Sequence, residues 1–139
     1  MSAHVNEIKH PDIPVSEVID NNKFTIYLRN DLIVYVLIKQ NNFFDVPDVT
    51  EVLDGIKKVS KGNIFPLIAV YETNIGFSKK AKDIVANHHL TTADALVTLD
   101  NWPIRVLANF YLKVNKPVRP TRIFGEVNTA LDWLKLNRG

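Results

Sequence analysis

The chain has 139 residues and a mass of 15.8 kDa, a length typical of one domain. Hydrophobic residues make up 46% of the chain and charged residues 23%, so it can form a core of its own, and disorder over most of its length is excluded. Cysteine is absent and the net charge is only +2, which excludes disulfides, thiol nucleophiles and thiolate zinc sites and gives no indication of nucleic-acid binding.

The charge is unevenly distributed along the chain. Residues 1–72 hold 7 basic and 10 acidic side chains, whereas residues 73–139 hold 10 basic and 5 acidic ones. This pattern fits either an ordinary surface of mixed sign or a basic half that favours an acidic or phosphorylated partner. No apolar run reaches the roughly 18 residues of a membrane span, and residues 1–22 lack the apolar segment of a signal peptide. We therefore expect a cytoplasmic protein without a membrane span.

The first part of the chain predicts an arm followed by a β-hairpin. Residues 1–22 show no sustained period and contain Pro11 and Pro14, so we expect an extended or mobile arm and a single domain over residues 23–139. Apolar and polar residues alternate over 24–28, as in a half-buried strand. An Asn-Asp pair suited to a tight turn follows, and the unbroken apolar run at 32–38 is typical of a central strand.

Alternating helices and strands make up the rest of the chain. A helix capped by Asp45 or Asp48 is expected to start near Pro47 and to end at Lys61-Gly62, with Glu51 completing a capping box from Asp48. Further strands are predicted at 64–71, 95–99 and 121–124, and further helices at 78–89, 102–115 and 126–136. The order ββαβαβαβα predicts an α/β fold whose mainly parallel sheet is opened by the hairpin.

The sequence contains no catalytic constellation that we could identify. Its five glycines form neither a dinucleotide-binding nor a P-loop pattern, and no cofactor is indicated. The one polar strand-to-helix loop is 72–78, where Thr73, Asn74, Gly76 and Ser78 are candidates for a phospho-switch or an anion-binding loop. The alternative is that Ser78 only caps the following helix. His88 and His89 are adjacent and diverge on a helix, so no metal site is predicted.

The helix predicted at 102–115 is unusually apolar. Its hydrophobic positions cover an arc of about 240° at 100° per residue, whereas one packing face needs little more than 100°. The surplus is covered either inside the domain, including by the N-terminal arm, or by a partner. Val106, Phe110 and Val114 follow an i, i+4, i+8 spacing and are the candidate interface of a homodimer.

Three segments of the second half resemble a known family. The segments are Ala108–Pro117, Pro120–Phe124 and Ala130–Leu134. They resemble uncharacterised bacterial SpoIIAA-like proteins, also described as STAS/SEC14-like, and in particular members from the Bacteroidetes. The resemblance covers roughly residues 23–137 and agrees with the predicted element order.

The wider STAS resemblance implies an anti-sigma-factor-antagonist fold with a switch serine at the start of the helix after the third strand. Ser78 is the hydroxyl at that position, but the Asp-Ser-[ST]-Gly signature of the family is replaced by Asn74-Ile75-Gly76-Phe77-Ser78. The resemblance implies a non-enzymatic regulatory or protein-interaction module. The alternative is a domain that binds a small or apolar ligand, which a closed apolar pocket of several hundred Å³ would favour.

Overall fold

The computed structural model describes residues 17–39, 42–72, 76–98 and 102–138, with side chains in the helix at 102–115 for residues 108, 109 and 111–115. The described part is an α/β fold built on a six-stranded sheet of order β1-β2-β3-β5-β7-β8. The six strands are β1 (Val18–Asp20), β2 (Phe24–Leu28), β3 (Val34–Ile38), β5 (Phe65–Tyr71), β7 (Thr91–Val97) and β8 (Thr121–Phe124). The four helices are α1 (Val46–Ser60), α2 (Lys79–Asn87), α3 (Trp102–Asn115) and α4 (Val127–Leu136).

The pairing of the strands confirms a mainly parallel sheet. β1 pairs with β2 and β2 with β3 in antiparallel orientation, whereas β3, β5, β7 and β8 are parallel to one another. The two long apolar runs of the sequence form β3 and β5, which lie inside the sheet, as their apolar composition predicts.

Three short strands are absent from the predicted order. β1 lies within the segment predicted as an arm and pairs with β2, while residues 1–16 lie outside the described residues. β4 (Phe43–Phe44) and β6 (Gly76–Phe77) form a separate two-stranded parallel sheet. Strands this short carry no periodicity in the sequence, so only their pairing partners define them.

Several predicted boundaries are corrected by the backbone geometry. β3 begins at Val34 rather than at residue 32, because Leu32 has a φ of 62° and belongs to the hairpin loop. β7 spans Thr91–Val97 instead of 95–99, because its pairing with β5 begins at Thr91. The capping box of α1 joins Asp45 and Asp48, so Glu51 is not part of it.

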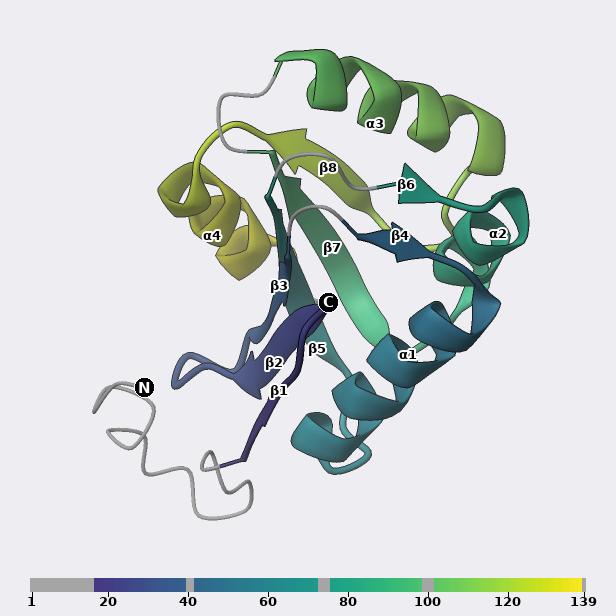
Figure 1. Ribbon diagram of the computed structural model, residues 1–139. Coiled ribbons are helices and arrows are strands. Elements are labelled where there is room, and N and C mark those ends of the chain that lie inside the picture. The colour runs from purple at the N-terminus through teal and green to yellow at the C-terminus, as the bar shows by residue number, and fades with distance from the viewer. Residues whose placement is uncertain (1–16, 40–41, 73–75, 99–101, 139) are drawn as a thin grey trace.

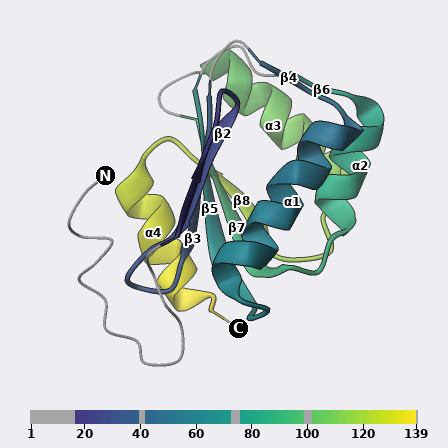
Figure 2. The same ribbon diagram turned by 60° about the horizontal axis from the view of Figure 1, so that its bottom comes forward.

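Helices cover both faces of the sheet. Figures 1 and 2 show α1, α2 and α3 on one face and α4 on the other. Alternate residues of β5 supply the two cores: Leu67 and Ala69 belong to the cluster under α1, whereas Ile68 and Val70 belong to the cluster under α4. The period of two along a strand therefore separates the two layers.

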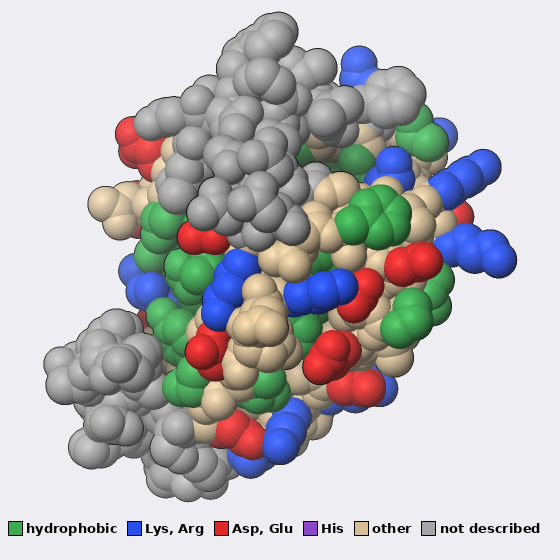
Figure 3. All heavy atoms as spheres, in the orientation of Figure 1, with side chains coloured by type: hydrophobic (Ala, Val, Ile, Leu, Met, Phe, Trp, Pro, Cys, Tyr) green, Lys and Arg blue, Asp and Glu red, His purple; other side chains and the backbone are tan. Residues whose placement is uncertain are grey.

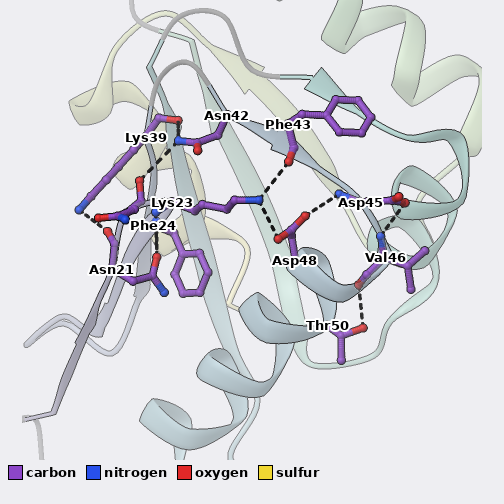
Figure 4. A network of polar contacts seen from close by, with 11 residues as sticks. Asn21, Lys23, Phe24, Lys39, Asn42, Phe43, Asp45, Val46, Asp48 and Thr50 are labelled. Atoms are coloured by element: carbon purple, nitrogen blue, oxygen red, sulfur yellow. Dashed lines mark hydrogen bonds and ion pairs between the residues drawn. The ribbon is translucent and has the colours of Figure 1, made fainter.

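The start of α1 is fixed to the sheet by a polar network (Figure 4). The Nζ of Lys23 lies 2.8 Å from Asp48 Oδ1 and also donates to the carbonyl of Phe43. Asp48 Oδ2 accepts from the backbone N–H of Asp45. Further along the helix, Gly55 lets α1 approach β2 closely, because a Cβ there would lie 2.8 Å from Ile26 Cδ1.

Candidate functional site

β7 presents very different side chains to the two faces of the sheet. Ala93, Ala95 and Val97 lie in the apolar core under α4. Asp94 and Leu96 alternate with them along the strand and line a pocket on the other face. Thr98 continues this alternation one residue beyond the strand and lines the same pocket. Its backbone N–H donates to the carbonyl of Phe124, which continues the pairing of β7 with β8.

The pocket, which we call the α3 pocket, has a volume of about 340 Å³ and a mainly apolar lining. This volume lies at the lower end of the range of about 300–1,000 Å³ for small-molecule sites. The described lining residues come from the six-stranded sheet and the residue after β7, from β6, from α2 and α3, and from the segment that joins α3 to β8. They are Tyr71, Gly76, Phe77, Lys82, Val85, Asp94, Leu96, Thr98, Ala108, Tyr111, Val114, Asn115, Arg119 and Thr121.

A buried ion pair forms one part of the lining. Arg119 Nε lies 2.7 Å from Asp94 Oδ2, and both side chains are only 5% exposed. The hydroxyl of Thr91 donates to the other carboxylate oxygen of Asp94 over 2.6 Å. Burial raises the pKa of Asp94, an effect that the charge of Arg119 opposes. Both oxygens of the carboxylate thus have partners within the chain.

Arg119 also caps the end of α2. Its guanidinium donates to the carbonyls of Val85, Ala86 and His88, and α2 has no basic residue in its own last turn. Carbonyls at the end of a helix lack partners within the helix and carry partial negative charge. A cation that lies 31 or more residues further along the chain therefore ties α2 to β7.

Two hydroxyls beside this pair have no hydrogen-bond partner among the described residues. They are Thr98 Oγ1, in a side chain that is 2% exposed, and the phenol oxygen of Tyr111. Burial raises the pKa of Tyr111 to about 12, so the phenol remains protonated at neutral pH. A buried hydroxyl without a partner can bind a water or a ligand; among the described residues Ser60 and Thr92 also have such hydroxyls, but they do not line the pocket.

Lys82 contributes a positive charge to the pocket. It lies on α2, is half-buried, and has no ion-pair partner among the described residues. Figure 3 shows Lys and Arg side chains interspersed with Asp and Glu over the described part of one face.

His88 lies at the end of α2 and serves a structural purpose. Its Nδ1 accepts a hydrogen bond from the backbone N–H of Leu90 over 3.1 Å. Burial, with a smaller contribution from Arg119, lowers the pKa of His88 to about 3. The imidazole is therefore neutral, as the hydrogen bond requires. The described residues contain no group of three His, Asp or Glu side chains that could hold a metal ion.

The predicted phospho-switch loop is only partly described. Thr73 and Asn74 lie outside the described residues, Gly76 is in β6, and Ser78 is the N-cap of α2. The hydroxyl of Ser78 accepts from the N–H of Ala81 and donates to Asp45 Oδ1 over 2.8 Å. The predicted cap is confirmed. A carboxylate in contact with Ser78 disfavours an anion there, and phosphorylation of Ser78 stays a prediction.

The predicted interface of α3 is described at one of its three positions. Val114 is 59% exposed, whereas the side chains of Val106 and Phe110 lie outside the described residues. Other apolar positions of the wide arc, Ala108 and Tyr111, line the α3 pocket. The homodimer therefore stays a prediction, and part of the apolar surplus of α3 has another explanation.

Asp94 and Arg119 were missed by reasoning from the sequence. The strand predicted at 95–99 does not include Asp94. Arg119 lies between Pro117 and Pro120 in a segment that shows no periodicity. The β-branched residues Thr91 and Thr92 favour a strand that starts before Ala95. No pattern in the sequence indicates that the two charges pair.

The fold and the pocket define an α/β domain with a small-molecule-sized cavity beside its sheet. The chain belongs to the family described as Domain of unknown function (DUF7793), whose model matches residues 26–137. No curated protein and no solved structure matches the chain. None of the described helices is long and apolar enough to span a membrane.

Proposed function

We propose that this domain binds a small, mainly apolar molecule in the α3 pocket. The observation that carries the proposal is the pocket itself: about 340 Å³, apolar over most of its lining, with a few polar groups among the apolar ones. Pockets of this size and composition are typical of small-molecule sites. The pocket also reaches Tyr71 and Thr98 at the carboxyl ends of β5 and β7, and ligands of open α/β sheets bind near these strand ends.

The composition of α3 supports the proposal. A helix that packs on one face needs a single apolar stripe, and α3 carries far more. Ala108 and Tyr111 are spaced three residues apart, and both line the pocket, so apolar residues here form the wall of a cavity. A bound ligand covers such a wall without a second protein chain.

The proposal can be tested with two neutral probes of different shape, 1-octanol and 3-phenylpropan-1-ol. In two-dimensional amide NMR, at least one probe should shift the signals of Leu96, Thr98 and Tyr111 in a saturable way. Ala108→Trp should abolish these shifts by filling the pocket. Asn109→Trp is the matched control, because it places the same side chain at the neighbouring exposed position.

Saturable binding that persists in the Ala108→Trp variant would place the probe elsewhere and overturn the proposal. The absence of binding by both probes to the unmodified protein would overturn it as well. Near-ultraviolet circular dichroism of both variants checks that they remain folded.

A further inference from the structure

The charges of the described residues that line the α3 pocket do not cancel. Lys82 and Arg119 are positive and Asp94 is negative, which leaves one positive charge in the lining. Asp94 is already bound by Arg119 and Thr91. All three guanidinium nitrogens of Arg119 donate hydrogen bonds, to four acceptors in total. The unbalanced charge is therefore that of Lys82.

The other partly buried lysines among the described residues each have a carboxylate partner, whereas Lys82 has none there. Lys23 and Lys39 lie within 3 Å of Asp48 and Asp20, respectively. Lys82 has no carboxylate within ion-pair distance among the described residues, although it is partly buried and lines the pocket. An ammonium group beside a mainly apolar pocket attracts an anion bound there more strongly than it would in bulk water.

The two buried hydroxyls add hydrogen-bond donors to this charge. Thr98 and Tyr111 both line the pocket and lack partners among the described residues. A carboxylate only accepts hydrogen bonds and does so at two oxygens, whereas an ammonium group only donates. The described lining thus combines a cation without an ion-pair partner among the described residues, two hydroxyl donors and an apolar wall.

Resting on the proposed function, we infer that the ligand is an organic monocarboxylate whose acid group pairs with Lys82 and whose apolar body fills the rest of the α3 pocket. One unpaired cation suits a single negative charge. A phosphate ester carries about two charges and three acceptor oxygens, for which the described lining offers no second unpaired cation. The apolar body would lie against Phe77, Val85 and Leu96.

The experiment compares octanoate, 1-octanol and octylamine, and likewise 3-phenylpropanoate and its alcohol, by NMR titration at neutral pH. We expect the carboxylate of a pair to bind at least about fivefold more tightly than the alcohol, the effect of one moderately exposed ion pair. Octylamine should bind most weakly. Lys82→Gln should lower the affinity for the carboxylate about fivefold and leave that for the alcohol unchanged.

Lys79→Gln is the matched control, because Lys79 lies on the same helix, is exposed and does not line the pocket. It should leave all affinities unchanged. Equal losses of carboxylate affinity in the two lysine variants would overturn the inference, and so would a carboxylate that binds no more tightly than its alcohol. In either case, binding of the alcohol in the pocket would still support the proposed function. If neither the alcohols nor the acids bind in the pocket, the proposed function fails too.

Discussion

The two sides of β7 differ, because one lies in an apolar core and the other lines the α3 pocket. On the side under α4, Ala93, Ala95 and Val97 belong to one apolar cluster with Ala130, Leu131 and Leu134 of α4. The other side presents an acid, a leucine and a threonine to a pocket. Burial without polar groups needs no partners, whereas each polar group on the pocket side must be matched by another group. One strand therefore supplies both a core and a site.

The largest change in stability is expected from breaking the buried ion pair of Asp94 and Arg119 on the pocket side. Arg119→Met removes the partner of a buried carboxylate and should lower the free energy of unfolding by about 3–5 kcal/mol. Without Arg119 the pKa of Asp94 rises further, so Asp94 takes up a proton in the folded variant as the pH falls from 7 towards 5. The loss of unfolding free energy relative to the unmodified protein should therefore be smaller at pH 5 than at pH 7. Urea unfolding at both pH values measures this. The double variant Asp94→Asn/Arg119→Met should regain part of the loss, and a deficit independent of pH would contradict the argument.

A second variant pair compares the packing on the two sides. Leu134→Ala deletes a fully buried side chain of the α4 core and should cost about 2–5 kcal/mol, because it leaves a cavity. Leu96→Ala on the pocket side should lie at the low end of this range, since it only enlarges a pocket that already exists. Equal losses in urea unfolding would show that the pocket side is packed as tightly as the α4 core.

The neutral imidazole of His88 makes the pocket side sensitive to acid. The pKa of His88 is about 3 in the folded chain and about 6.5 in the unfolded one. Between these values the unfolded state binds a proton that the folded state does not, so stability falls as the pH is lowered through this window, by at most about 1.4 kcal/mol per unit. His88→Asn keeps an acceptor for Leu90 and should flatten the profile between pH 7 and 5. Parallel profiles of the two proteins would rule out this role.

The smallest effect is a gain of stability. Thr98→Val removes a buried hydroxyl without a partner among the described residues and should raise the free energy of unfolding by about 1 kcal/mol. Thr91→Val makes the same change at the first residue of β7, but there the hydroxyl binds Asp94, so the sign should be opposite. Thermal unfolding of the ligand-free protein distinguishes the two. A loss of stability in both variants would mean that the hydroxyl of Thr98 has a structural partner.

Local patterns in the sequence predicted those features that depend on neighbouring residues alone. The apolar runs predicted β3 and β5, the capping preference of serine predicted the start of α2, and the segment at 102–115 was predicted as a helix with the bounds that α3 has. The mainly parallel sheet followed from alternating strands and helices. The strands, the helix and the cap follow from patterns of neighbouring residues, and the parallel pairing follows from the order of these elements along the chain.

The tertiary structure alone decided the short strands and the site. β1, β4 and β6 exist only through their pairing partners, and the pair of Asp94 and Arg119 joins residues 25 positions apart. The apolar surplus of α3 was visible in the sequence, but only the packing shows that part of it lines a pocket. Periodicity reports which side of an element is apolar; whether that side meets a core, a cavity or another chain depends on which distant elements come to lie against it.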